Sequence, residues 1–303
     1  MPNSKLTESA SHYRPDIDVI RAIAIIAVVI YHVFPNILPG GFIGVDVFFV
    51  ISGYLITNNI YTPILEDRFN LIKFYERRIR RLFPTLILVI ITTLSFSLLT
   101  MNREGQTQLK SHSIGSLGFY VNFIFMNEYG YFNNTTDTKP LAHIWSLAIE
   151  EQFYLLWPAI LILTCKLHIT KRWMISSMIA SFIYSVYLLY QDDVMAFYSP
   201  AARFWELMTG SLVAVILKQP VKKVVKKRNL LVWLMLTILL VSMFTVHHSM
   251  GFPGYIALIP VFCTRKLPHQ VDNSKLEIPV LNVLGMNSMG VLSPRESWGL
   301  NSL

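Results

Sequence analysis

The sequence has 303 residues, of which 53% are hydrophobic and only 15% are charged, and its mean hydropathy is +0.47. A water-soluble protein of this length needs more polar surface, so the composition excludes that class and indicates a polytopic membrane protein. The formal net charge of +8 does not indicate a nucleic-acid partner, because basic residues of membrane proteins gather in cytoplasmic loops.

Apolar runs that approach the length needed to cross a hydrocarbon core of about 30 Å predict the helices. In chain order these helices cover 19–35, 42–60, 82–101, 147–165, 174–190, 203–218 and 229–246, with a weaker one at 253–263. The short segment 114–127 contains two glycines, and we expect it to be re-entrant or interfacial. Only then do the basic stretches at 66–84, 166–172 and 218–228 all face the cytoplasm, together with the N-terminus.

The expected fold class is therefore all-α: a polytopic transmembrane helix bundle with about seven or eight spans and a non-crossing segment near 114–127. The polar opening, residues 1–12, has no signal-peptide cleavage site and is expected to be a flexible cytoplasmic leader. Cys165 and Cys263 have no spacing typical of a metal site or a disulfide framework, and no metal is expected.

Three ionisable residues lie in the first two apolar segments. Arg21 and His32 are eleven residues apart, which places them on nearly one helix face, about 16 Å apart along the axis. Asp46 follows at the start of the next helix, at about the depth of His32, so we expect a His32–Asp46 pair that leaves one imidazole nitrogen free as a general base. The alternatives are a buried polar pair with no catalytic role and, for Arg21, snorkelling to the inner phosphates.

Four arginines stand in the run FYERRIRRLFP, at the cytoplasmic foot of a span. Composition alone favours a patch that holds anionic lipid headgroups. The functional interpretation is a site for a phosphorylated ligand, in which Arg78 and Arg81 share a helix face and grip one pyrophosphate, with Arg77 beside them.

Two further stretches bring carboxylates to helix starts. In HIWSLAIEEQFYLLWP, Glu150 and Glu151 enter an apolar span, and we expect at least one of them to be functional; His143 is more simply a bystander. In RFWELMTG, Arg203 and Glu206 are three residues apart, so a structural ion pair within one helix is the expected arrangement.

Five stretches together resemble, in order, the signatures of the bacterial acyltransferase family 3 membrane proteins, which include O-antigen and peptidoglycan O-acetyltransferases. They are YRPDIDVIRAIAIIAVVIYH, GGFIGVDVFFVISGYLIT, FYERRIRRLFP, HIWSLAIEEQFYLLWP and RFWELMTG. The resemblance implies an enzyme of the bacterial inner membrane that moves an acyl group, usually acetyl, from cytoplasmic acyl-CoA to a hydroxyl of a cell-surface glycan.

In that scheme acyl-CoA is the donor substrate and no cofactor stays bound. The acceptor is a surface polysaccharide or a lipid-linked glycan, membrane lipids surround the chain, and nucleic acid is not a partner. The resemblance makes His32 the essential histidine and assigns functional positions to Arg21, Arg78 and Arg81. Asp46 or Glu150 would assist His32. Direct transfer and a covalent acyl-enzyme relay both remain open.

The resemblance covers residues 13–263, which we interpret as an incomplete membrane acyltransferase domain. Residues 264–303 form an atypical tail without a span of adequate length, which is typical of a truncated or frameshifted reading. Two alternatives follow: an inactive acyltransferase remnant, or a glycan or lipid transporter that uses the same polar residues without making bonds. Transfer of an acyl group from CoA distinguishes the enzyme from both.

Overall fold

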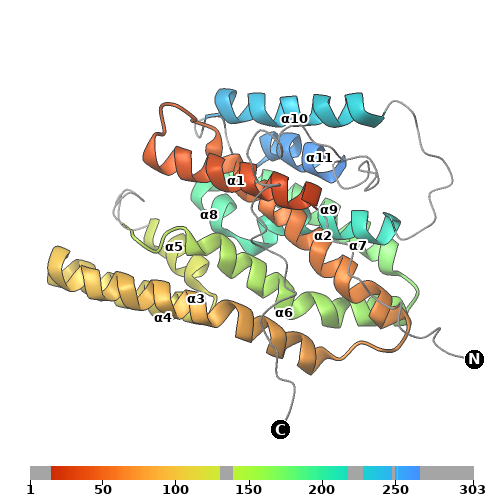
Figure 1. Cartoon of the computed structure of the whole chain (residues 1–303), viewed down its shortest axis with the longest axis horizontal. Coiled ribbons are helices and arrows are strands. Elements are labelled where there is room, and N and C mark those ends of the chain that lie inside the picture. The colour runs from red at the N-terminus through yellow and green to blue at the C-terminus, as the bar shows by residue number, and fades with distance from the viewer. Residues whose placement is uncertain (1–14, 130–138, 218–227, 248–249, 251, 267–303) are drawn as a thin grey trace, which may run out of the picture.

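The computed structural model describes residues 15–129, 139–217, 228–247, 250 and 252–266, and the regular secondary structure of this part of the chain is entirely helical (Figure 1). The all-α prediction is therefore confirmed. The helices are α1 (Pro15–Val33), η1 (Gly41–Ile43), α2 (Gly44–Leu65), α3 (Leu71–Thr100), α4 (Arg103–Leu117), α5 (Val121–Tyr129), α6 (Ile144–Lys166), α7 (Thr170–Gln191), α8 (Asp193–Tyr198), α9 (Pro200–Leu217), α10 (Arg228–Thr245), η4 (Tyr255–Ala257) and α11 (Leu258–Lys266).

Five of the described helices are long and apolar enough to cross a membrane, namely α2, α3, α6, α7 and α9. The other predicted spans correspond to α1, whose first two turns contain Asp16, Asp18 and Arg21, and to the shorter apolar stretches Trp233–Thr245 and Tyr255–Thr264. The chain is a multi-pass membrane protein. The expected leader 1–12, and the tail from residue 267 onward, lie outside the described residues.

Helix α3 begins eleven residues before its predicted start at residue 82. The side chain of Asn70 accepts a hydrogen bond from the backbone N–H of Lys73 at 2.9 Å, which caps the helix at Leu71. The four arginines thus stand on the first turns of α3, which agrees with the expectation that Arg78 and Arg81 share a helix face, whereas the predicted start of the helix was too late. Hydropathy hides such a helix start, although Arg, Lys and Glu all favour the helical state.

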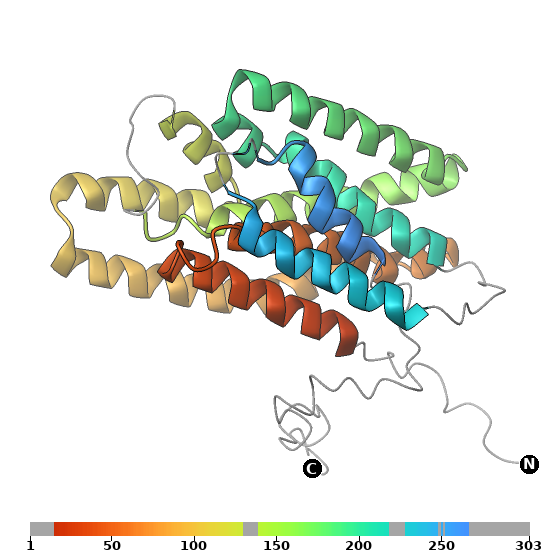
Figure 2. The same cartoon turned by 90° about the horizontal axis from the view of Figure 1, so that it is seen from above.

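Segment 114–127 does not form one helix. Helix α4 ends at Leu117, Phe119 adopts a left-handed backbone with φ 53°, and α5 starts at Val121. This break agrees with the prediction that the segment does not cross as a single span. Helices α3 and α4 run side by side at one edge of the bundle in both views (Figures 1 and 2).

Helices α2 and α9 cross at close approach, and two glycines permit it. A Cβ atom on Gly53 would lie 1.9 Å from the carbonyl oxygen of Leu207, and one on Gly210 would lie 1.9 Å from that of Val50. The hydroxyl of Ser211 donates to the carbonyl of Gly53 at 3.0 Å across the same crossing. Small residues that bring backbones together replace the hydrophobic effect as the driving force between membrane helices.

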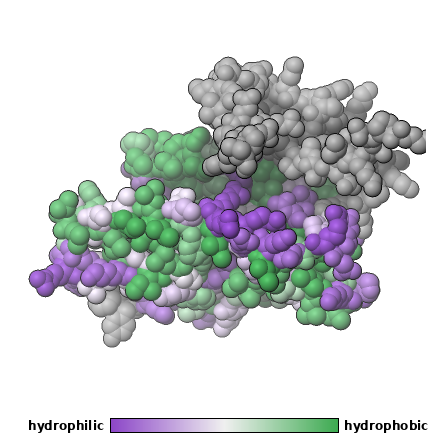
Figure 3. Space-filling view, turned by 60° about the horizontal axis from the view of Figure 1, so that its bottom comes forward, coloured by the Kyte–Doolittle hydropathy of each residue, from purple (hydrophilic) through white to green (hydrophobic). Residues whose placement is uncertain are grey.

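Two apolar clusters share α2 and α9. One cluster extends from them to α3, α4, α5 and α6, and the other to α1, α10 and α11. Many large apolar side chains remain exposed outside these clusters, including Leu99, which is 86% exposed. One face of the molecule shows apolar side chains over much of its area, with hydrophilic ones at the left tip and across the right-hand part (Figure 3). An apolar outer surface of this kind suits lipid.

Candidate active site

The strongest polar contact between α3 and α6 joins Arg78 to Glu151. The guanidinium Nε lies 2.9 Å from Oε2 of Glu151, and Nη2 lies 2.6 Å from Oε1, so the pair is bidentate. The guanidinium carbon also lies 3.4 Å from the centre of the Tyr154 ring. The two helices run antiparallel, and the hydroxyl of Tyr75, one turn earlier on α3, donates to the carbonyl of Leu155 at 2.6 Å. Arg78 is therefore held firmly from several sides.

Glu150 extends this contact into a network of four helices. The hydroxyl of Ser52 on α2 donates a hydrogen bond to Glu150. Arg78 on α3 and Arg21 on α1 both lie close enough to Glu150 to interact with it electrostatically. The network contains two carboxylates and two guanidinium groups among apolar helices, and ionisable groups in that environment usually mark a functional path. We refer to Arg21, Ser52, Arg78, Glu150, Glu151 and Tyr154 as the inner cluster.

His32 lies in the last turn of α1 and is exposed. Its Nδ1 atom is 2.8 Å from the carbonyl oxygen of Val28, one turn earlier. A carbonyl can only accept, so Nδ1 carries the proton in the neutral ring and Nε2 keeps its lone pair. The helix backbone itself therefore prepares His32 as a base.

Asp46 does not pair with His32, which corrects the expected arrangement. Its Oδ1 atom accepts a hydrogen bond from Nη1 of Arg203 at 2.8 Å, and its side chain is fully buried. The same nitrogen lies 2.9 Å from Oε1 of Glu206, as expected for the pair in RFWELMTG. A buried carboxylate needs a cation, and the α2–α9 crossing brings Arg203 to it while His32 stays at the surface. We refer to Asp46, Arg203 and Glu206 as the triad.

The expected arginine fork also differs in the structure. Arg78 is engaged by Glu151, whereas Arg77 and Arg81 are exposed on the same helix. Arg80 is exposed as well and pairs with Glu76 one turn away at 2.7 Å. Arg78 thus has a protein partner while Arg77 and Arg81 are exposed, and a pyrophosphate site shared by Arg78 and Arg81 stays a prediction.

Sequence reasoning missed two features near the N-terminal end of α6. His143 lies close enough to His32 for a charge on one ring to disfavour a charge on the other. A separate cluster joins buried Lys139 and His112 to Glu128, which is 21% exposed. The sequence holds no spacing signal for either feature, because the residues come from segments that only the fold brings together.

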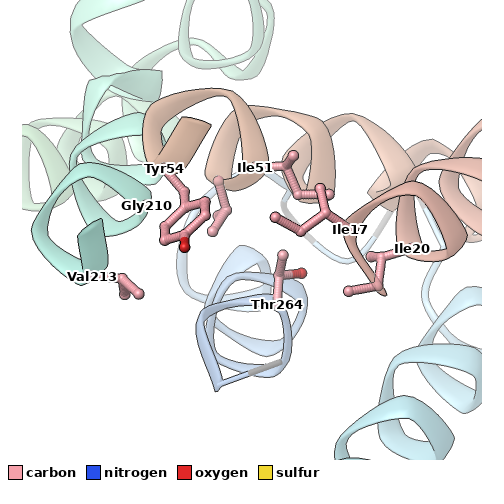
Figure 4. Close-up of a pocket in the computed structure, with 8 residues that line it drawn as sticks. Ile17, Ile20, Ile51, Tyr54, Gly210, Val213 and Thr264 are labelled. Carbon is pink, nitrogen blue, oxygen red and sulfur yellow. The ribbon is translucent and has the colours of Figure 1, made fainter. Parts of the chain in front are cut away.

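A small apolar cavity lies between α1, α2, α9 and α11 (Figure 4). None of its lining residues carries a carboxylate, an imidazole or a basic group, so we assign no chemistry to it. The lining residues are Ile17, Ile20, Val50, Ile51, Tyr54, Gly210, Val213 and Thr264.

Comparison with known proteins shows the family of the chain. Residues 14–292 match the family described as an acyltransferase domain (Acyl_transf_3). The chain is 34% identical over 212 residues to the O-acetyltransferase OatA of Staphylococcus aureus (strain NCTC 8325 / PS 47), which covers 67% of this chain and 35% of that protein. It is 36% identical over 222 residues to the peptidoglycan O-acetyltransferase OatA of Listeria monocytogenes, covering 70% of this chain and 35% of that protein.

The putative peptidoglycan O-acetyltransferase YrhL of Bacillus subtilis is 36% identical over 225 residues, covering 71% of this chain and 35% of that protein. The chain thus spans about a third of the length of these relatives. No solved structure matches it. The family match covers most of the chain and includes the residues of the inner cluster and His32. The chain therefore belongs to the acyltransferase family 3 of multi-pass membrane proteins.

Proposed function

We propose that this chain transfers an acyl group, most simply acetyl, from cytoplasmic acyl-CoA to a hydroxyl group of a glycan outside the membrane. The observation that carries the proposal is the position of His32 relative to the basic start of α3. The C-terminal end of α1 and the N-terminal end of α3 lie at opposite ends of the long axis of the bundle (Figure 1), and the inner cluster links the helices between them.

His32 acts as the general base. Its Nε2 atom, left unprotonated by the hydrogen bond from Nδ1 to Val28, accepts the proton of the acceptor hydroxyl. The hydroxyl oxygen attacks the thioester carbonyl, the C–S bond breaks, and the imidazolium returns the proton to the CoA thiolate. In an acyl-enzyme relay the same base would activate the acceptor in the second step, so both routes use His32 in this way.

The donor end uses arginines in two ways. Arg77 and Arg81 are exposed near the cytoplasmic end of α3 and bind the phosphates of CoA. Arg78 and Arg21 stay inside, where they counter the charge of Glu150 and Glu151 and keep the path polar. Acyl-CoA is therefore a substrate that binds and dissociates in each reaction cycle, and not a resident cofactor.

The names of the Listeria and Bacillus relatives favour peptidoglycan as the acceptor over other surface polysaccharides or lipid-linked glycans. The basic stretches at 66–84 and 166–172 favour a cytoplasmic N-terminus in the inner membrane, because the positive residues of short loops stay inside.

The test uses membranes that contain the protein, radiolabelled acetyl-CoA and a soluble glycan acceptor. We expect labelled ester on the acceptor and release of free CoA, and we expect His32→Ala to lower both by about 10² to 10⁴-fold, the usual contribution of a general base. The matched control is His247→Ala, an exposed histidine that follows α10. Equal activity of His32→Ala and wild type at equal protein levels would overturn the catalytic role, and acceptor movement without ester formation would indicate a transporter.

A further inference from the structure

The triad contains two acidic side chains and a single cation. Nη1 of Arg203 donates to Oδ1 of Asp46 at 2.8 Å and to Oε1 of Glu206 at 2.9 Å, so one nitrogen atom serves both carboxyl groups. The side chain of Arg203 is 1% exposed, and those of Asp46 and Glu206 are 0% exposed. If both carboxyl groups were ionised, the closed group would therefore hold one negative charge that Arg203 does not balance.

Each carboxyl group also has a second oxygen without a partner. Oδ2 of Asp46 and Oε2 of Glu206 are both shielded from solvent, and neither has a hydrogen-bond partner among the described residues. The two side chains lie within hydrogen-bonding reach of each other. Two ionised carboxylates cannot bond to each other, because neither has a donor, whereas one proton makes one of them a donor.

The surroundings of the triad offer no other compensating charge. In the described part of the chain, Arg203 is the only cation with which either carboxyl group interacts. The guanidinium carbon lies 5.0 Å from the centre of the Phe252 ring, 5.1 Å from that of Phe197 and 5.7 Å from that of Trp145. An isolated charge in such apolar packing is costly enough that a carboxylate takes up a proton instead.

The inner cluster provides a comparison within the same bundle. There, the carboxylates of Glu150 and Glu151 interact with two guanidinium groups, those of Arg21 and Arg78. Charges of opposite sign are equal in number, and the Arg78–Glu151 pair is partly open to solvent. No proton is needed to balance the inner cluster, so the imbalance distinguishes the triad from it.

A metal ion is a second way to supply the missing positive charge, and the triad does not suit it. Hard metal cations take several oxygen ligands, whereas the triad has two free oxygens and is lined by aromatic rings. The described residues contain no group of three or more His, Cys, Asp and Glu side chains that could hold a metal ion. A proton needs only one donor oxygen and one acceptor oxygen, which the two carboxyl groups provide.

We propose that Asp46 and Glu206 bind one proton between their free oxygens, so that the triad is a neutral, proton-loaded site at pH 7. The proton comes from water when the bundle folds. It joins one carboxyl group to the other as a hydrogen bond, and the remaining negative charge pairs with Arg203. The proton belongs to the pair and not to either residue alone. This site is separate from the proposed function, and its tests need no acyl transfer.

Infrared spectroscopy of the purified full-length protein in lipid vesicles gives the first test. A protonated carboxyl group has a carbonyl stretching band that an ionised carboxylate lacks. We expect one such band of the wild type at pH 7 to disappear in Asp46→Asn and equally in Glu206→Gln, because the remaining carboxylate then pairs with Arg203 as an ion. Glu76→Gln is the control, since it removes an exposed carboxylate that pairs with Arg80, and it should leave the band unchanged.

Three spectroscopic results would overturn the proposal. They are the absence of a carboxyl band in the wild type, a band that survives both substitutions, and a band lost in only one of the two variants. The third result would mean that one carboxyl group is protonated independently of the other.

The pH dependence of stability gives the second test. The folded wild type binds one proton more than the unfolded chain at pH 6 to 7, so its stability falls as the pH rises through this range. We expect the folding equilibrium constant of the wild type, divided by that of Asp46→Asn, to fall about tenfold from pH 6 to pH 7. Denaturant unfolding in detergent measures this ratio, and contributions from other groups cancel in it.

A ratio that does not change with pH would contradict the shared proton. If Asp46→Asn does not accumulate, Glu206→Gln takes its place as the reference with the same expected ratio. The measurement is repeated with sodium and potassium replaced by choline, and we expect the same result. A ratio that depends on the metal cation and not on pH would place a metal ion in the triad and overturn the proposal.

Discussion

Two Arg–Glu contacts in the same bundle differ in how exposed their side chains are, and we expect them to differ in function for that reason. In the triad, Arg203 is 1% exposed and both carboxylates are fully buried. In the inner cluster, Arg78 is 25% exposed and Glu151 is 9% exposed. A closed ionic group locks helices together, whereas a partly open one remains accessible to a substrate.

The triad is closed by aromatic rings as well as by charge. The guanidinium of Arg203 lies 5.0 Å from the ring of Phe252 and 5.1 Å from that of Phe197, and its Nε donates to the carbonyl of Phe197 at 3.2 Å. Little room is left for a substrate beside Asp46. The inner cluster, by contrast, has Glu150 only partly buried and a serine hydroxyl beside it. The comparison assigns stability to the first group and chemistry to the second.

The largest expected effect is on stability. Arg203→Met leaves two buried carboxylates without their cation, and we expect a loss of about 3–5 kcal/mol in the free energy of unfolding. Arg78→Met should cost less, about 1–2 kcal/mol, because its pair is partly solvated. Thermal unfolding of the purified variants in detergent measures both. Equal losses for the two arginines would remove the distinction between the groups.

The second effect is on activity per folded molecule. Arg78→Ala disturbs the inner cluster beside Glu150, and we expect acetyl transfer to fall about 10²-fold, as small misplacements near a reacting group do. Asp46→Asn should leave the activity of the folded fraction within about twofold, because Asp46 contacts Arg203 and not His32. Transfer assays normalised to folded protein provide the measurement. A folded but inactive Asp46→Asn would show that Asp46 takes part in the chemistry after all.

The smallest effect concerns pH and the Lys139–Glu128–His112 cluster. Burial lowers the pKa of His112, the hydrogen bond and charge of Glu128 oppose it, and the charge of Lys139 lowers the pKa further, so it lies below its usual 6.5. The stability that neutral His112 contributes is present above pH 6.5 and is lost as the pH falls below it. Burial raises the pKa of Glu128, but the hydrogen bonds from Lys139 and His112 outweigh it, so the pKa ends below its usual 4.5. The stability that Glu128 contributes is therefore present above pH 4.5 and is lost as the pH falls through the lowered pKa.

We therefore expect the unfolding temperature of the wild type to fall on acidification, first below pH 6.5 and again below pH 4.5. Glu128→Gln should flatten the second decline and leave the response above pH 7 unchanged. An identical pH profile in Glu128→Gln would show that this carboxylate is not linked to folding.

The sequence predicted the helices well where hydropathy alone decides, as for α2, α6 and α9, whose ends differ by only a few residues from those expected. It failed at the start of α3, where charged residues on a capped helix look like a loop. The remaining predicted spans also correspond to helices, although α1 carries charged residues in its first turns and the apolar stretches of α10 and α11 are shorter than the other spans.

Among the site residues, too, some contacts could be predicted from the sequence and others could not. Arg203 and Glu206 are three residues apart, so local spacing predicted their contact. The partner of Asp46 is 157 residues away in the chain and that of Arg78 is 73 away, and no local pattern identifies such partners. The pairing of His32 with Asp46 was inferred from depth alone. The depth of a residue in the membrane does not determine how its helix is rotated about its own axis. In the structure, α2 is rotated so that Asp46 faces α9.

The central claim is that the acyl group enters at the basic end of the bundle and leaves at the end of His32. Sealed vesicles of known orientation, with acetyl-CoA on the cytoplasmic side only and the glycan acceptor on the outer side only, measure this directly. The account predicts ester on the outer acceptor in the wild type and in His247→Ala, and none above background in His32→Ala. Transfer that requires donor and acceptor on the same side, or that persists in His32→Ala, would contradict it.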